Sequence, residues 1–132
     1  MIWVTVLFTV FIIGLIVLAD MGKMRFLLWL LSRFPYGDKI VHFGLIGGLS
    51  FLLNTTAMQL LPKQSPRRVS LIVTLFLLVV FTLEEISQGP IRGRDASLSD
   101  LAANYAGIIT FALLAYLTRK KTQDTLSVKS VD

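Results

Sequence analysis

The residues with reactive or ligand-binding side chains gather in two stretches of the chain. In the first, Asp38, Lys39 and His42, the aspartate and the histidine are four residues apart. On a helix this spacing puts them on one face, where the carboxylate can orient or charge the imidazole. The second stretch contains Glu84, Glu85, Gln88, Arg92, Arg94, Asp95, Ser97, Asp100 and Asn104. Such side chains can act as acid and base, hold a divalent cation, or bind a polar headgroup.

The rest of the chain is strongly apolar. Of its 132 residues, 55% are hydrophobic and only 16% are charged, which lies outside the usage of soluble proteins. The net charge of +5 comes from Lys and Arg placed between apolar runs, so we expect anionic lipid headgroups rather than nucleic acid as its partner. Because the chain has no Cys, a disulfide framework, a thiolate metal site and a thiol nucleophile are excluded.

Four apolar segments predict the elements that position the polar side chains. They cover residues 2–19, 40–61, 69–88 and 100–117. Each is long enough to cross a hydrocarbon core of about 30 Å at about 1.5 Å per residue. The first lacks the basic start and the cleavage site of a signal peptide, so we expect it to remain as a helix. The predicted fold class is all-α: a polytopic membrane protein with a four-transmembrane-helix bundle and a short interfacial segment after the first helix.

That interfacial segment, residues 26–31, is too short to cross a membrane. It carries Trp29 and is followed by Arg33, a composition typical of a helix in the headgroup region. The segment is therefore predicted to lie in the interface or at the edge of the bundle. Asp38 then follows a Pro-Tyr-Gly turn and is predicted to cap the second helix.

Residues 1–121 are predicted to form one membrane domain, and the polar residues 122–132 a disordered tail. In the second helix, Gly44 and Gly48 have the G-x-x-x-G spacing that permits close helix contact, either inside the bundle or between two copies of the chain. Lys and Arg are divided almost evenly between the two sides, so the positive-inside rule leaves the orientation open.

Chain connectivity brings the two polar stretches together. In a four-helix bundle the second and fourth helices begin on the side where the third ends, so their polar ends converge at one membrane boundary. The predicted ligand-binding or functional cluster consists of Asp38, Lys39, His42, Glu84, Glu85, Gln88, Arg94, Ser97, Asp100 and Asn104. Any membrane protein also places polar residues at its water boundary. Two adjacent carboxylates at the C-terminal end of a helix oppose its dipole, however, so they need a partner such as Arg94.

The order and spacing of these motifs resemble those of the VanZ-like family of small bacterial membrane proteins. The family patterns read roughly D-K-x-x-H, D/E-E-x-x-Q, G-R-x-x-S-x-x-D and N-x-x-G. In this chain they fall at residues 38–42, 84–88, 93–100 and 104–107. The chain departs from them in having Glu84 where Asp is common and Ser87 where His often stands, which argues against a role that needs a second imidazole. The resemblance implies a multi-pass protein of the bacterial cytoplasmic membrane with a role in the cell envelope, linked to teicoplanin resistance.

Two functions of different classes follow from the same residues. In the first, which is not enzymatic, Arg94 and Lys39 hold a phosphate or carboxylate of a lipid or envelope precursor, and the neighbouring polar side chains bind the rest of its headgroup. In the second, a membrane-embedded hydrolase or transferase uses His42 and Glu85 as acid and base, or as ligands of Mg²⁺ or Mn²⁺. A Walker loop, a G-x-S-x-G elbow and an H-E-x-x-H helix are absent from the sequence, so no familiar catalytic class is indicated. We assign no cofactor and no metal ligand.

Overall fold

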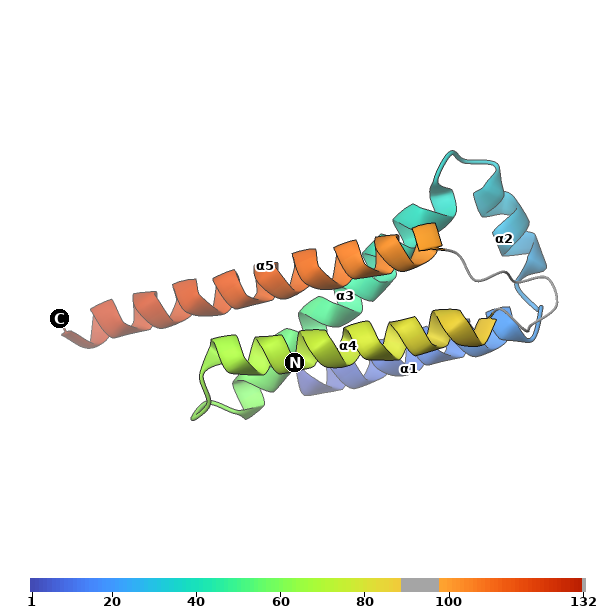
Figure 1. The fold of residues 1–132 in the computed structure, drawn as a ribbon. Helices are drawn as coiled ribbons and strands as arrows, with labels where there is room; N and C mark the ends of the chain where they lie inside the picture. The colour runs from blue at the N-terminus through green and yellow to red at the C-terminus, as the bar shows by residue number, and fades with distance from the viewer. Residues whose placement is uncertain (89–97, 132) are drawn as a thin grey trace.

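The computed structural model describes residues 1–88 and 98–131, and of Leu28, Asp38 and Gln88 only the backbone. These residues form five helices and no strand. The helices are α1 (Ile2–Asp20), α2 (Arg25–Ser32), α3 (Gly37–Leu60), α4 (Pro66–Gln88) and α5 (Leu98–Val131) (Figure 1). By length and composition α1, α3, α4 and α5 are each able to cross a membrane. The predictions of an all-helical fold and of four long apolar helices are confirmed.

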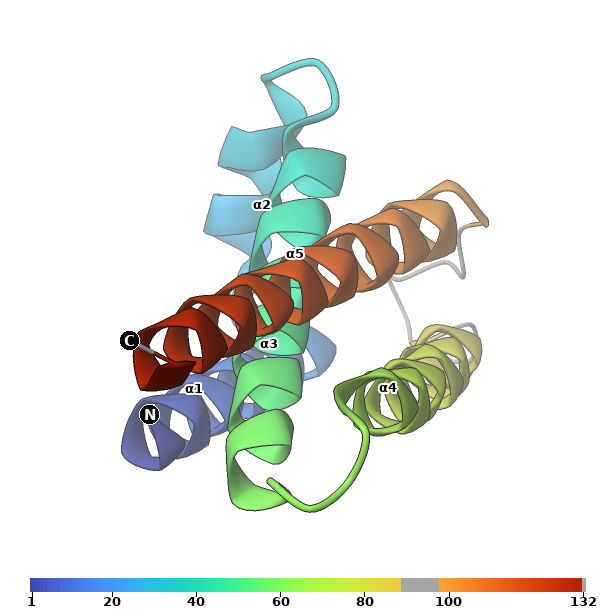
Figure 2. The same cartoon turned by 90° about the vertical axis from the view of Figure 1, so that its left-hand side faces the viewer.

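The bundle is built around α3, which contacts each of the other four helices and has its largest interface with α5. Figure 2 shows α3 inclined to α1, α4 and α5, which surround it. All four long helices contribute to one apolar cluster. Its buried members are Ile12, Ile46, Leu49, Leu77, Phe81 and Ile108.

The α3–α5 interface is close because each of the two helices places a glycine in it. A Cβ on Gly107 would lie 2.6 Å from the carbonyl oxygen of Phe43, and one on Gly47 would overlap the ring of Phe111. Gly44 and Gly48 do not form the predicted close contact inside the bundle, and contact between two copies of the chain stays a prediction. Gly44 has no atom within 4 Å of its Cβ position, and Gly48 makes an ordinary contact with Phe8 of α1. On α3 the glycine that lets α5 approach is Gly47, which directly precedes Gly48 of the predicted pair.

The start of α3 differs from the prediction. The residue that caps it is Tyr36, whose backbone is left-handed (φ 59°, ψ 19°), and Gly37 is the first helical residue. Gly37 packs on the preceding turn so closely that a Cβ would lie 2.7 Å from the carbonyl oxygen of Leu31. The prediction that Asp38 caps this helix is therefore wrong, because the turn already ends at Tyr36 and Asp38 lies within the first helical turn.

The short helix α2 packs against α3 at one end of the bundle, and its own exposed face is aromatic. Phe26 and Trp29 stack with ring centroids 5.9 Å apart, and the guanidinium of Arg33 lies 4.4 Å from the centroid of the Trp29 ring. α2 therefore packs at the edge of the bundle and presents an aromatic and basic surface, and its place in the membrane interface stays a prediction.

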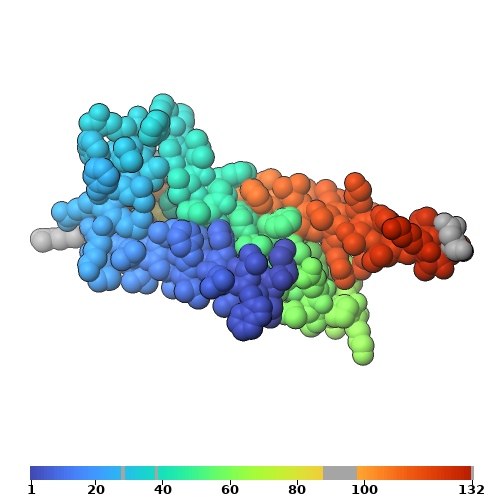
Figure 3. Space-filling model, turned by 180° about the vertical axis from the view of Figure 1, so that it is seen from behind, coloured from blue at the N-terminus to red at the C-terminus, as the bar shows by residue number. Residues whose placement is uncertain are grey.

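The C-terminal helix is longer than predicted. Residues 118–131 contain no Pro or Gly, and α5 continues through them to Val131 instead of ending at Leu117. Their side chains are almost all exposed, and Figure 3 shows this part of α5 protruding beyond the other helices. The described part of the predicted disordered tail is thus a helix without packing partners in the bundle.

Candidate functional site

The polar ends of the helices meet at one end of the molecule. The C-terminal ends of α1 and α4, the whole of α2 and the N-terminal ends of α3 and α5 lie there, whereas the α3–α4 turn and the C-terminus lie at the other end (Figure 1). Residues that are far apart in the sequence, such as His42 and Asn104, therefore come into contact, as chain connectivity predicts.

Two polar contacts join the starts of α3 and α5. Nζ of Lys39 lies 3.6 Å from Oδ1 of Asp100, and Nδ1 of His42 lies 3.0 Å from Oδ1 of Asn104. Lys39 and His42 are one helical turn apart on α3, as Asp100 and Asn104 are on α5, so the two contacts are successive rungs between the same helix faces. The Lys39–Asp100 contact, which we call the outer rung, is formed by partly exposed side chains. In the His42–Asn104 contact, the inner rung, Asn104 is only 1% exposed to solvent.

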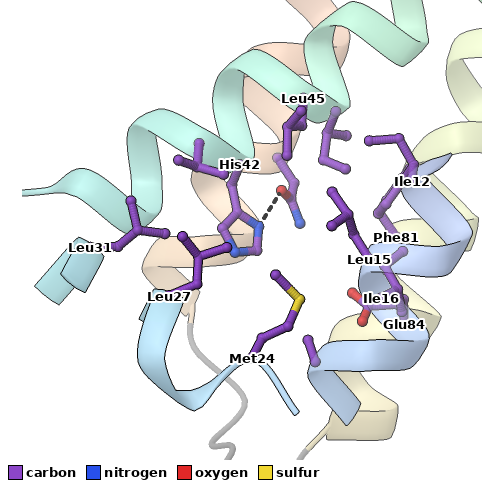
Figure 4. Close-up of a pocket in the computed structure, with 14 residues that line it drawn as sticks. Ile12, Leu15, Ile16, Met24, Leu27, Leu31, His42, Leu45, Phe81 and Glu84 are labelled. Atoms are coloured by element: carbon purple, nitrogen blue, oxygen red, sulfur yellow. Dashed lines mark hydrogen bonds between the residues drawn. The ribbon is translucent and has the colours of Figure 1, made fainter. Parts of the chain in front are cut away.

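A cavity of about 160 Å³ opens beside the inner rung. Its walls come from α1, α2, α3, α4 and α5 and from the turn between α1 and α2. The lining residues are Ile12, Leu15, Ile16, Ala19, Met24, Leu27, Leu31, Val41, His42, Leu45, Ile46, Phe81, Glu84 and Asn104. Only three of these are polar. In Figure 4, His42 and Glu84 face the hollow from opposite sides, with aliphatic side chains between them.

The His42–Asn104 pair keeps further hydrogen-bonding capacity. Because Oδ1 of Asn104 accepts the hydrogen bond, Nδ1 of His42 is the donor, and Nε2 is left as an acceptor. Among the described residues, Nε2 has no hydrogen-bond partner, and neither does the buried Nδ2 of Asn104. A buried amide donor without a partner is costly, which singles out this end of the cavity as a place where a ligand would be stabilised.

The two adjacent glutamates of α4 have different environments. Glu84 is partly exposed and lines the cavity. Glu85 is only 3% exposed and is not among the described residues of the lining. Their adjacency on the helix turns them to different sides, so the sequence pattern does not by itself show which of the two faces the cavity.

No family model, curated protein or solved structure matches the chain. The resemblance to the VanZ-like family therefore stays a prediction from the residue patterns at 38–107. Two of these patterns meet in the structure. In N-x-x-G, Asn104 and Gly107 lie on the same face of α5, where Asn104 bonds the His of D-K-x-x-H and Gly107 packs on the backbone of Phe43.

Of the predicted cluster, Lys39, Asp100, His42 and Asn104 come together as the two rungs, and Glu84 reaches the same cavity. Glu85 is buried near the end of α4. Arg94 and Ser97 lie outside the described residues, as do the side chains of Asp38 and Gln88, so the pairing of Arg94 with the adjacent carboxylates stays a prediction.

Sequence reasoning missed the apolar part of the site. The walls that α1 and α2 contribute, among them Leu15, Ala19 and Leu27, carry no functional groups that would have marked them. The only available signal was that residues 26–31 are amphipathic, with Leu27 and Leu31 on a different face from Phe26 and Trp29.

The described residues hold no group of three or more His, Cys, Asp or Glu side chains that is placed to bind a metal ion. His42 is instead held by an amide, and the one carboxylate of the described lining stands across the cavity from it.

Proposed function

We propose that this chain is a multi-pass protein of the bacterial cytoplasmic membrane that binds the polar end of a lipid or lipid-linked envelope precursor. The observation that carries the proposal is the cavity itself, which is apolar along most of its wall and has a hydrogen-bonding pair at one place. An amphiphile has the same division, so its headgroup would meet His42 and Asn104 while the first part of its chain contacts the aliphatic wall.

Large apolar side chains on the outer faces of the helices support the membrane setting. Leu75, Phe76 and Val79 of α4 are each about 60% exposed, and comparable residues cover the outside of α1 and α5. Water would not tolerate so much contiguous apolar surface on a monomer, whereas lipid would. The exposed aromatic face of α2, with Arg33 over Trp29, suits the headgroup region beside the cavity.

The size of the cavity defines how much of a ligand it could take. A volume of about 160 Å³ is close to that of a cavity that holds one benzene molecule. It therefore has room for a small polar group and a few methylenes, and the rest of a lipid chain would lie outside it along the apolar flanks of α1 and α2.

Binding is better supported than the hydrolase or transferase alternative. That alternative requires His42 and Glu85 to reach the same reacting group, but Glu85 is buried and not among the described residues that line the cavity. The contact of His42 with an amide orients its ring and serves a binding site equally well.

Filling the cavity tests the proposal. Ala19 of α1 lines it, so Ala19→Trp would occupy much of its volume, whereas Ala102→Trp puts the same side chain on an exposed face of α5. We expect lipid that co-purifies with the protein, measured by mass spectrometry per mole of chain, to fall at least fivefold in Ala19→Trp and to be unchanged in Ala102→Trp. Equal lipid in both variants would contradict the proposal.

The role in the cell envelope rests on the resemblance of residues 38–107 and needs a cellular test. In a glycopeptide-susceptible bacterial host, we expect expression of the chain to lower sensitivity to teicoplanin, and Ala19→Trp to remove the effect while the amount of protein in the membrane stays the same. Unaltered sensitivity with well-inserted protein would count against the envelope role but not against lipid binding.

A further inference from the structure

The end of the molecule opposite the cavity carries cations from parts of the chain that are far apart in the sequence. We propose that this end is a docking surface for the headgroups of anionic phospholipids, with Arg119 of α5 as the residue that binds a phosphate. We call the surface the basic end. Its members are Lys63, Arg67, Arg68, Arg119, Lys120 and Lys121. It is separate from the cavity and does not depend on ligand binding there.

A buried contact of three helices brings these cations together. Met58 of α3, Val69 of α4 and Ala115 of α5 belong to one apolar cluster. The two arginines of α4 directly precede Val69, and Arg119 follows Ala115 by about one helical turn. The basic residues of α4 and α5 therefore flank the same buried contact, at the end of the molecule where α3 turns into α4 (Figure 1).

The charge at the basic end is not offset by acidic residues. Residues 61–68 and 118–132 contain seven Lys and Arg but only two acidic residues, so they account for the whole net charge of +5. Residues 20–42 and 84–100 contain six of each kind. Lys and Arg are divided almost evenly between the two sides, but the net charge is not, and an anionic lipid surface would attract one end of the molecule only.

The cations of the basic end also lack local partners. Within the part of the chain that the structure describes, none of them forms an ion pair with a carboxylate. At the cavity end, by contrast, Nζ of Lys39 lies 3.6 Å from Oδ1 of Asp100. Cations that are crowded together without acids repel one another, so bound anions would stabilise the basic end.

Arg119 is the cation of the basic end that is built into the bundle. Its side chain is half-buried, whereas those of Lys120 and Lys121 are exposed. Its Nε is buried and has no hydrogen-bond partner among the described residues. A buried N–H without an acceptor costs free energy, and the planar guanidinium matches two oxygens of a phosphate. Arg119 therefore marks the place where one headgroup would be held.

The apolar surroundings of the basic end favour a lipid over another polyanion such as nucleic acid. Leu60 and Leu61 at the end of α3 and Leu117 of α5 are about half exposed or more, and each lies within three residues of a cation in the sequence. Apolar surface beside cations matches the acyl chains and the phosphate of a phospholipid. The first turn of α4 has no acidic residue, so its helix dipole adds to the attraction for anions.

Native mass spectrometry of the full chain tests the docking surface. The protein is delipidated in detergent and titrated with phosphatidylglycerol or phosphatidylcholine that have the same acyl chains. We expect phosphatidylglycerol to bind about tenfold more tightly, since a basic residue next to an anionic headgroup contributes about fivefold in affinity. In the variant Arg67→Gln/Arg68→Gln/Arg119→Gln this preference should fall to within about twofold. A preference that is absent from the unaltered chain, or that survives in this variant, would overturn the proposal.

A matched control removes the same charge from the cavity end, in Lys23→Gln/Arg25→Gln/Arg33→Gln. This variant should prefer phosphatidylglycerol as strongly as the unaltered chain does. An equal fall in both triple variants would overturn the docking surface, because net charge alone would then explain the binding. The preference should also persist in Ala19→Trp, which fills the cavity. Its loss there would assign the anionic lipid to the cavity instead of the basic end.

Two neighbouring residues test the role of Arg119. Arg119→Gln removes the guanidinium with the buried Nε, whereas Lys120→Gln removes the same charge from an exposed position on a different side of α5. We expect the affinity for phosphatidylglycerol to fall about fivefold in Arg119→Gln and less than about twofold in Lys120→Gln. Equal effects would refute the assignment of the phosphate to Arg119, and this pair of single variants decides even if a triple variant does not fold.

A short single-stranded DNA oligonucleotide is the competing polyanion. We expect no displacement of phosphatidylglycerol when the oligonucleotide is added at the same concentration as the lipid. Displacement would assign the basic end to nucleic acid and overturn the lipid assignment.

Discussion

At the scale of single residues, Asn104 and Gly107 show how one helix face serves both the site and the fold. The two residues lie three apart on α5 and both meet α3. Gly107, with no side chain, lets the two backbones come close one turn from the hydrogen bond between Asn104 and His42. The close packing of α3 and α5 and the polar pair beside the cavity thus share one helix face.

Glycine substitutions test this close approach. In Gly107→Ala the new methyl would meet the carbonyl oxygen of Phe43 at 2.6 Å, and backbone cannot move aside as a flexible side chain can. We expect a loss of about 1–3 kcal/mol in the free energy of unfolding, measured by denaturation in mixed micelles. Gly44→Ala is the matched control on α3. Its Cβ position has nothing within 4 Å, so we expect a gain of up to about 1 kcal/mol from helix propensity. A Gly107→Ala variant as stable as Gly44→Ala would show that the helices are farther apart than described.

At the scale of elements, α1 is a wall of the cavity that is held loosely. Only Thr5 and Ile12 of this helix are buried, yet its last turns line the cavity. The hydroxyls of Thr5 and Thr56 lie 2.6 Å apart, and the Thr5 hydroxyl also lies 3.5 Å from the carbonyl oxygen of Leu52, so Thr5 links α1 to α3. Together with the contact of Phe8 on Gly48, it sets where the wall stands relative to His42.

The Thr5–Thr56 link can be measured by a double-mutant cycle with Thr5→Val and Thr56→Val. Hydrogen bonds between transmembrane helices average about 0.6 kcal/mol, and we expect a coupling energy of that size. Thr118→Val is the control, because the Thr118 hydroxyl donates within its own helix to Leu114 and lies in the exposed part of α5. Purely additive effects of Thr5→Val and Thr56→Val would mean that the hydrogen bond between these two hydroxyls does not help to hold α1 on α3.

At the scale of the whole molecule, the lengths of the helices predict how the chain sits in a bilayer. α5 has 34 residues. At about 1.5 Å per residue it is about 50 Å long, well beyond a hydrocarbon core of about 30 Å. Its basic residues 119–121 directly follow the apolar part of the helix, so they suit the headgroup layer, and the remaining helix would stand in water on the side opposite the cavity.

Single-cysteine labelling tests this arrangement, and the absence of Cys from the sequence means that no background residue must be removed. With a membrane-impermeant maleimide, we expect Ser32→Cys and Ser99→Cys to be labelled from one side, and Gln64→Cys and Thr125→Cys from the other. All four positions are exposed. Leu113→Cys, on the outer face of α5, should react only after detergent is added. Labelling of Ser32→Cys and Gln64→Cys from the same side would overturn the four-helix arrangement.

The sequence by itself determined the number and approximate extent of the long helices, because an apolar segment of this length must satisfy its backbone hydrogen bonds internally. It also determined which polar stretches meet, since that follows from connectivity alone. Only the tertiary structure decided the details that depend on contacts between helices. These include the use of Gly47 and Gly107 in place of Gly44 and Gly48, the start of α3 after Tyr36, and the choice of Glu84 over Glu85 for the cavity. An aliphatic side chain carries no functional group that would mark it in the sequence as part of a site. The apolar walls beside His42 could therefore be identified only from the packing of the helices.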